Sequence, residues 1–257
     1  MDAKRLYLKG HWVTELPSET IASATGSARR GPKRDPAKAA AIAAASCTVL
    51  TAQGVRLTKV AHIAEAAGIA AGTVYLYASE KAVLVEMALR HAARMDLGAG
   101  VGSAALNPDT ERFETVSAEA VDTRLVWPVL DRAAEEAPGA VGLETILAEA
   151  YDLLAGERIL IALLDKCAGE VPVWERLYAE GARRRYLTAF EAAIRRLAGA
   201  GLVRSDVDHA AGARAILEML VWMAMRRPGD TLPPACDEAA AREASLALAS
   251  AALRPDR

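Results

Sequence analysis

The sequence predicts an all-α protein, with a small N-terminal three-helix domain followed by a larger helical body. Hydrophobic residues make up 53% of the 257 residues and are mostly alanine and leucine, whereas aromatic residues make up 5%. This composition favours helices over sheets. Apolar residues recur at helical spacing along most of the chain, and glycine or proline separates the periodic segments. The length allows two domains, or one domain with a large helical body.

The first predicted helix covers residues 40–53. It is rich in alanine, and Ile42, Ala45 and Val49 fall on one apolar stripe. Gly54 follows at the position of a C-terminal cap. The segment therefore reads as one buried helix that ends at this glycine.

A second and a third helix follow, joined by a tight turn. The apolar stripe of the second helix has the spacing i, i+3, i+4 and i+7, in Val60, Ile63, Ala64 and Ala67. Thr58 precedes this stripe and is predicted to cap the helix with its hydroxyl. Gly68 ends the helix where a left-handed residue is needed. The pattern is typical of a helix-turn-helix unit.

The third helix is short and begins near Ala71. Gly72 destabilises the helix by about 1 kcal/mol relative to alanine. Close approach to another surface would explain a glycine at this position. Val74 is predicted to face inward, and the outward side chains are expected to be Thr73, Tyr75, Leu76 and Tyr77. A fourth helix then opens with Lys81, whose first turn favours a phosphate, and reaches about residue 95.

These segments resemble the N-terminal domain of the TetR family of transcriptional regulators. The resemblance rests on the Ala45-to-Gly54 segment, the Ile63-Ala64 pair, Ala67-Gly68-Ile69, Gly72-Thr73-Val74-Tyr75, Tyr77, and Lys81 with Leu84. Two residues depart from the family pattern, which usually has an aromatic residue at Ala78 and a small polar residue at Glu80. The alternative is a helical hairpin within a larger bundle, its tyrosines packed on a neighbour.

The resemblance implies a DNA-binding surface on the second, third and fourth helices. The implied contact residues are Thr58, Lys59, Ala71, Gly72, Thr73, Tyr75, Leu76, Tyr77 and Lys81. Hydroxyl and ammonium groups position a protein on phosphates, while Leu76 could meet a thymine methyl and Tyr77 a base edge. No arginine, asparagine or glutamine stands on the third helix, so we expect modest base discrimination, partly through DNA shape.

Residues 1–35 are predicted to be a flexible extension with a basic arm. Four positive charges lie within six residues, broken by glycine and proline, in Arg29, Arg30, Lys33 and Arg34. Such arms enter the minor groove beside a helix-turn-helix, and a solvated linker is the alternative. Residues 1–97 hold 13 basic and 8 acidic residues, whereas residues 98–257 hold 18 and 25. This polarity is expected when only the N-terminal end meets phosphate.

The first domain boundary is predicted near residue 95, with residues 36–95 as the helix-turn-helix domain and residues 96–257 as a ligand-binding and dimerisation domain. Helices are expected at 123–136, 143–154, 158–166, 173–197, 206–227 and 237–253, after a glycine- and alanine-rich loop at 97–107. In the family, the last two long helices pair with a second subunit. The candidates for that interface are Ala213, Ile216, Leu217, Leu220, Val221, Met225, Ala244, Leu246, Leu248 and Ala252. Alternatively, this face packs on its own domain.

The middle helices are expected to hold a pocket for a small molecule, which we expect to be lipophilic or aromatic. The candidate lining residues are apolar or amphipathic: Trp127, Leu147, Tyr151, Leu154, Leu164, Cys167, Trp174, Tyr178 and Phe190. Taken singly, each of them fits a core position better than a ligand contact. The sequence thus predicts a dimeric repressor of operator DNA that a ligand releases. The alternative is a structural DNA-binding protein of the same fold that ignores small molecules.

Other classes of protein find less support in the sequence. No nucleophile elbow, glycine-rich phosphate loop or metal spacing is present, so we expect neither an enzyme nor a bound cofactor or metal. The three cysteines and four histidines are scattered. Apolar runs such as residues 159–164 are too short to span a bilayer, and no secretory signal is evident. We expect a cytoplasmic protein without a membrane partner.

Overall fold

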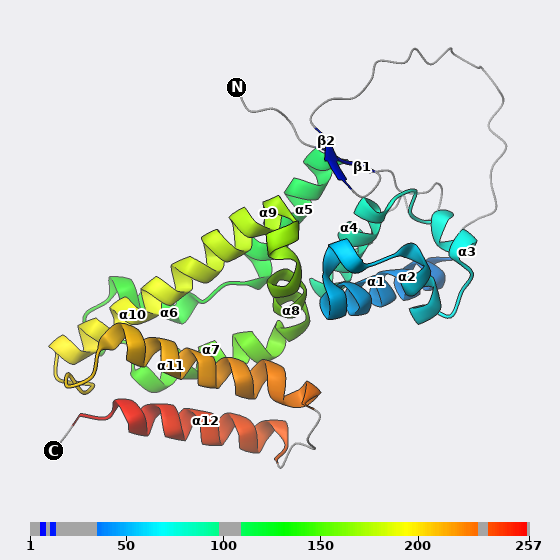
Figure 1. Cartoon of the computed structure of the whole chain (residues 1–257). Helices are drawn as coiled ribbons and strands as arrows, with labels where there is room; N and C mark the ends of the chain where they lie inside the picture. Colours follow the sequence, from blue (N-terminus) through cyan, green and yellow to red (C-terminus); the bar gives the residue numbers. More distant parts are fainter. Residues whose placement is uncertain (1–5, 9–10, 14–34, 98–108, 231–235, 256–257) are drawn as a thin grey trace, which may run out of the picture. The chain divides into compact units, whose positions relative to one another are not determined.

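The computed structural model describes residues 6–8, 11–13, 35–97, 109–230 and 236–255, and the described chain is almost entirely helical (Figure 1). It forms two compact units, which are described separately. Unit 1 comprises Met1–Ala120 and Lys166–Val173, and unit 2 comprises Val121–Asp165 and Trp174–Arg257. The predicted start of the second domain at residue 96 therefore lies inside unit 1.

Unit 1 contains the helix-turn-helix. Its main elements are α1 (Pro36–Leu57), α2 (Val60–Ala66), α3 (Ala71–Tyr75), α4 (Lys81–Ala92), most of α5 (Thr110–Arg124) and a 3-10 turn at Ala168–Glu170. An antiparallel hairpin, which the sequence did not predict, joins β1 (Leu6–Leu8) to β2 (His11–Val13), with Leu6 opposite Val13. The all-α prediction is otherwise confirmed.

Helix α1 is longer at both ends than predicted. Asp35 caps its start by accepting a hydrogen bond from the backbone N–H of Ala37, and Pro36 supplies a fixed φ in the first turn. Gly54 breaks the helix with a φ of +79° instead of ending it, and one more turn follows to Leu57. Thr58 ends this turn, so it does not cap α2 as expected.

The core of unit 1 forms where α1 packs on α2 and α4 and α3 packs on α2. Ile42, Ile63, Val74, Leu84 and Met87 are among its fully buried side chains. By length and apolar composition α1 could span a membrane. Its apolar stripe is buried in the core of unit 1.

Unit 2 is a bundle of helices. Its elements are the end of α5, α6 (Pro128–Glu135), α7 (Leu143–Gly156), α8 (Arg158–Cys167), α9 (Pro172–Trp174), α10 (Arg184–Gly199), α11 (His209–Val221) and α12 (Glu238–Leu253), with π-helical stretches at Glu175–Arg183 and Trp222–Arg226 and a 3-10 turn at Arg227–Gly229. The end of α8 and the start of α9 belong to unit 1. The predicted helix at 123–136 is interrupted, because α5 ends at Arg124 and Pro128 starts a new helix. The predicted loop at 97–107 lies almost wholly outside the described residues.

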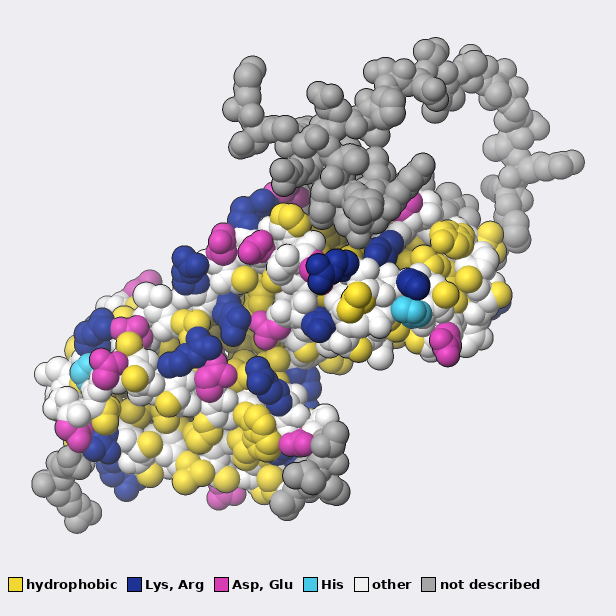
Figure 2. Space-filling view, in the orientation of Figure 1, with side chains coloured by type: hydrophobic (Ala, Val, Ile, Leu, Met, Phe, Trp, Pro, Cys, Tyr) yellow, Lys and Arg dark blue, Asp and Glu magenta, His cyan; other side chains and the backbone are white. Residues whose placement is uncertain are grey.

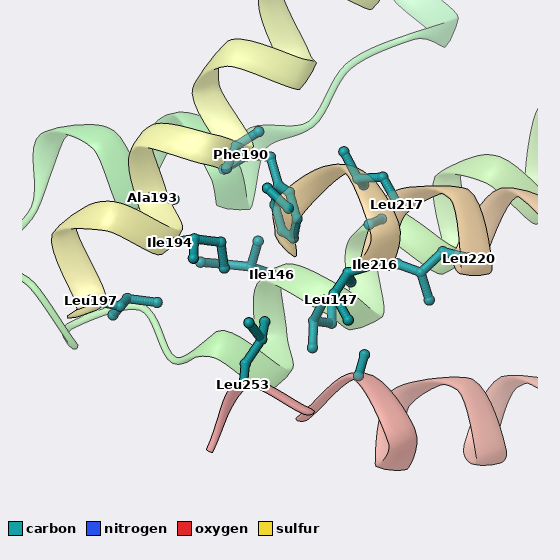
Figure 3. Packing of buried hydrophobic residues seen from close by; sticks show 14 of the residues in the cluster. Ile146, Leu147, Phe190, Ala193, Ile194, Leu197, Ile216, Leu217, Leu220 and Leu253 are labelled. Atoms are coloured by element: carbon teal, nitrogen blue, oxygen red, sulfur yellow. The ribbon is translucent and has the colours of Figure 1, made fainter. Parts of the chain in front are cut away.

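The core of unit 2 is built mainly from α7, α10, α11 and α12, and Leu130 of α6 is also buried in it. Figure 3 shows Phe190 and Ile194 of α10, Leu147 of α7, Leu217 of α11 and Leu253 of α12 directed toward one another. Burial of a large apolar side chain contributes about 1.5–3 kcal/mol. Residues from distant parts of the sequence thus fix the relative positions of these helices.

Candidate functional site

The turn between α2 and α3 has the conformation that the sequence predicted. Gly68 has a φ of +66°, which glycine adopts at little cost. The N–H of Ile69 donates to the carbonyl of Ala64, 2.9 Å away, and thereby closes the turn. Because Ile63 and Val74 are fully buried on the two sides of the turn, α2 and α3 are held as one rigid unit.

Helix α3 presents two large side chains to solvent. Tyr75 is 52% exposed and Leu76 is 54% exposed, as the outward face of a recognition helix requires. Thr73 beside them is half-buried, whereas Ala71 and Gly72 are exposed. No other side chain lies within 4 Å of the position that a Cβ on Gly72 would take, so the close approach expected there is not to another described part of this chain.

Tyr77 differs from the prediction. It is 4% exposed, and its hydroxyl accepts a hydrogen bond of 3.1 Å from the backbone N–H of Asp35 at the start of α1. Ala78 beside it is also buried. The ring of Tyr77 thus belongs to the core of unit 1, so its hydroxyl and ring edge are directed away from solvent and a base.

Lys81 and Thr58 also have internal partners. The ammonium group of Lys81 donates to the carbonyls of Val55, at 2.9 Å, and Thr58, at 3.1 Å. The hydroxyl of Thr58 is buried and donates to the carbonyl of Gly54 at 2.6 Å. Lys81 therefore ties the end of α1 to the start of α4.

Two tyrosine substitutions separate these roles. We expect Tyr77→Phe to cost about 1 kcal/mol of stability, because the N–H of Asp35 loses its partner, and to leave DNA affinity within about threefold. We expect Tyr75→Ala to lower DNA affinity about tenfold without a comparable loss of stability. Fluorescence anisotropy with labelled DNA and thermal unfolding would measure the two effects. Equal losses of DNA affinity in both variants would contradict this assignment.

Positive charge at this surface comes from α1 and the start of α2. Lys38, Arg56 and Lys59 are exposed in the described part of unit 1. The predicted basic arm, formed by Arg29, Arg30, Lys33 and Arg34, lies outside the described residues. Exposed ammonium and guanidinium groups would contribute the salt-dependent, sequence-independent part of DNA affinity.

A buried carboxylate joins α4 to α5. Glu86 is 3% exposed and accepts hydrogen bonds from Arg90, one turn further along α4, at 2.9 Å. It also accepts from Nε of Arg112 on α5, at 3.1 Å, and from its terminal nitrogen, at 2.9 Å. This hydrogen bond to Glu86 raises the pKa of Arg112, so Arg112 remains charged. The ion-pair cluster fixes the angle at which α5 leaves the helix-turn-helix.

The segment Lys166–Val173 packs against the end of α1. Glu170 accepts a hydrogen bond from the backbone N–H of Arg56, and a Cβ on Gly54 would lie 2.9 Å from a carboxylate oxygen of Glu170. The thiol of Cys167 donates to the carbonyl of Leu50 at 3.6 Å. Burial raises the pKa of Cys167 to about 12, so the thiol stays protonated and holds this contact.

Unit 2 contains a cavity of about 120 Å³ between its helices. Three of the predicted ligand residues line it: Trp127, Leu154 and Tyr178. Its other lining residues are Leu125, Ala150, Leu153, Ile161, Asp165, Ala182, Arg183, Tyr186, Leu187, Arg214, Leu217, Glu218, Val221, Met225 and Arg226. The charged residues among them were not predicted, because the predicted ligand residues were apolar or amphipathic.

The other predicted ligand residues lie elsewhere. Leu147, Tyr151 and Phe190 are in the core of unit 2, Leu164 and Trp174 are fully buried outside the cavity lining, and Cys167 contacts α1. All six are large or apolar and buried, which is the property the sequence pattern detects. Nothing in that pattern separates a core residue from one that lines a cavity.

The predicted dimerisation residues divide into two groups. Ala213, Ile216, Leu217 and Leu220 are buried in the core of unit 2, and Val221 and Met225 line the cavity, so this face of α11 packs on its own unit. On α12, Ala244, Leu248 and Ala252 are exposed, and Leu246 is partly buried. On α11 and the following π-helical turn, the exposed large apolar residue is Trp222.

Among the described residues, no group of three or more histidine, cysteine, aspartate or glutamate side chains is placed to hold a metal ion.

Comparison with known proteins places the helix-turn-helix in a family. Residues 42–88 match the model of the bacterial regulatory proteins of the tetR family. The ketosteroid transcriptional regulator KstR2 of Mycobacterium tuberculosis has a similar structure, with a TM-score of 0.50 and 15% identity over 87% of this chain and 98% of the other. A search of curated proteins gives no match.

A member of the TetR transcriptional regulator family from Streptomyces coelicolor A3 is similar to the same degree. Its TM-score is 0.50 and its identity 18%, over 97% of this chain and 98% of the other. The similarity to both structures agrees with the family match. The matched residues, 42–88, cover α2, α3 and most of α1 and α4. The N-terminal helix-turn-helix domain of this chain is therefore similar to that of the tetR family of bacterial regulatory proteins.

Proposed function

We propose that this protein is a dimeric repressor whose affinity for operator DNA falls when a small molecule binds in the cavity of unit 2. The observation that carries the proposal is the combination of an exposed recognition helix in unit 1 with a cavity in a separate unit. A ligand that favours one conformation of unit 2 would shift the spacing of two recognition helices. A hundredfold loss of DNA affinity requires only about 2.7 kcal/mol of coupling.

The DNA contacts that we propose come from exposed or half-exposed residues of α2 and α3. They are Lys59, Ala71, Gly72, Thr73, Tyr75 and Leu76. The backbone contacts of Lys81 and the burial of Thr58 and Tyr77 give these three residues a supporting role instead. With hydroxyl groups and one leucine on α3, base discrimination is expected to be modest, and DNA shape would supply part of the specificity. Such a regulator would act in the cytoplasm, where the DNA is located.

The proposed dimer forms through α11 and α12 and would place two recognition helices about 34 Å apart on one operator. Figure 2 shows hydrophobic side chains gathered over these two helices. Trp222 is 45% exposed and Leu248 is 62% exposed, and most of the other exposed side chains on α12 are alanine. An exposed apolar surface of this kind is typical of a protein interface. Small alanine side chains would let the helices of two subunits approach closely.

Fluorescence anisotropy of the full-length protein with DNA from upstream of its own gene tests this proposal. Binding that survives random competitor, with two proteins for each palindrome, is the expected result. Binding that disappears with salt and shows no preference would reduce the contacts to phosphates. Many dispersed chromosomal sites, with no response to small molecules, would favour the structural DNA-binding alternative.

A further inference from the structure

The cavity in unit 2 has aromatic walls and a small volume. Trp127 stacks on Phe190 with ring centroids 5.8 Å apart, and the ring of Tyr186 packs against Trp127 at the same distance, tilted by 56°. Trp127, Tyr186 and Tyr178 all line the cavity. Its volume of about 120 Å³ is close to the roughly 150 Å³ of an apolar cavity that binds benzene. A single ring with a short side chain therefore matches the space.

The carboxylates at the cavity already have partners. Asp165 accepts a hydrogen bond of 2.6 Å from the hydroxyl of Tyr178 and lies 3.6 Å from the guanidinium group of Arg183. Glu218 pairs with Arg214 at 2.5 Å. Burial and the charge of Asp165 raise the pKa of Tyr178 above its ordinary value, so this hydroxyl remains a donor. Both negative charges are thus neutralised within the cavity wall.

The polar groups without a partner at the cavity are both hydrogen-bond donors. Arg226 is exposed at the cavity, and its guanidinium group has no acceptor among the described residues. The indole nitrogen of Trp127 is buried, and the described part of the chain offers it no acceptor either. An unpaired buried N–H costs about 1–3 kcal/mol, which a ligand acceptor would offset. A protonated amine, which is donor-only, could satisfy neither group.

The unpaired groups of the cavity are donors, and the charge of Arg226 is not compensated. We therefore infer that the cavity binds a small aromatic carboxylate. The ring would pack against Trp127 and Tyr186, and the carboxylate would accept hydrogen bonds from Arg226. Carboxylate is acceptor-only and matches the planar guanidinium group in geometry. This inference rests on the proposed function, since it names the ligand class of the proposed effector cavity.

Three probes of nearly equal size test which charge the cavity prefers. Phenylacetate, 2-phenylethanol and 2-phenylethylammonium share a phenyl ring and a two-carbon arm and differ in the charge of the polar end group. Isothermal titration calorimetry of the full-length protein, without DNA, is expected to give phenylacetate a Kd of about 1 mM or below, at least about fivefold tighter than the alcohol. Added salt is expected to weaken phenylacetate binding only. Tightest binding by the amine, equal binding of acid and alcohol, or no phenylacetate binding would overturn the inference.

Substitutions test which side chain binds the carboxylate of phenylacetate. Arg226→Gln is expected to remove the fivefold advantage of phenylacetate and to leave the alcohol within about twofold. Arg184→Gln is the matched control, because Arg184 is exposed, lies outside the cavity and has no partner among the described residues. Trp127→Phe keeps the ring and removes the N–H, so it is expected to weaken both oxygen-bearing probes. Equal losses in the two arginine variants would overturn the assignment to Arg226.

A parallel anisotropy titration separates this inference from the proposed function. If phenylacetate binds in the calorimeter while operator affinity stays unchanged, the ligand class stands and the coupling to DNA fails for this compound. If the alcohol or the amine releases DNA and phenylacetate neither binds nor releases it, the ligand-responsive regulator stands and the carboxylate is excluded.

Discussion

Replacing Glu86 with alanine is expected to destabilise α4 and the start of α5 by about 3 kcal/mol. The substitution leaves Arg90 and Arg112 facing each other without the carboxylate to which both now donate. This loss of stability is at the lower end of the range for breaking a buried ion pair, because the side chains of Arg90 and Arg112 remain 15% and 32% exposed to solvent. Since α4 also carries Lys81, we expect DNA affinity to fall as well.

Hydrogen exchange measured by mass spectrometry checks this prediction locally, without assuming that the two units unfold together. A loss of about 3 kcal/mol corresponds to amide exchange roughly 150-fold faster in residues 81–92. Glu86→Gln keeps the shape of the side chain and one acceptor oxygen. Its amide exchange rate is expected to lie between those of the unmodified protein and Glu86→Ala. Glu111→Ala on α5 is the control, because Glu111 is exposed, and it should change exchange less than threefold. An equally small change in Glu86→Ala would contradict a structural role for the cluster.

Placing charges on the proposed dimer face is expected to convert the protein into a monomer. In the double variant Trp222→Glu and Leu248→Glu, two exposed apolar side chains become carboxylates that would be buried in the interface. Large anchors such as tryptophan each contribute about 2 kcal/mol or more, so dimer affinity should fall at least about a hundredfold. Affinity for a palindromic operator would fall with it, because each monomer meets only one half-site.

Analytical ultracentrifugation of the variant and the unmodified protein measures this change directly. The matched control is Ile159→Glu, since Ile159 on α8 is 54% exposed but lies away from α11 and α12 in the sequence. This control should remain dimeric and bind DNA normally. A double variant that still sediments as a dimer would remove α11 and α12 from the interface.

Local features of the DNA-binding domain could be predicted from the sequence. The conformation of Gly68 and the burial of Ile63 and Val74 follow from short-range spacing and from the cost of a positive φ. Tyr77 was predicted to face outward but is buried, because its hydroxyl pairs with the backbone N–H of Asp35 at the start of α1. A five-residue helix has too few turns for its period to show which face is buried.

The body of the protein was less predictable. The apolar face of α11 was compatible with a dimer interface or with its own core, and Leu217 and Leu220 are in the core. The cavity is assembled from residues of several helices, and its charged groups are Asp165, Arg183, Arg214, Glu218 and Arg226. The charge that the cavity offers to a ligand depends on which of these residues pair with each other. A single sequence does not show which residues pair.

The contact between Lys166–Val173 and the end of α1 bears on how such a regulator could be recombined. A chimera that joins residues 1–97 to the body of another regulator would omit Glu170 and Cys167. The N–H of Arg56 and the carbonyl of Leu50 would then lose partners that come from more than one hundred residues further along the chain. The recognition module is therefore not interchangeable as a continuous stretch of sequence. A working graft would have to carry the Lys166–Val173 segment, or a replacement for it, in the recipient body.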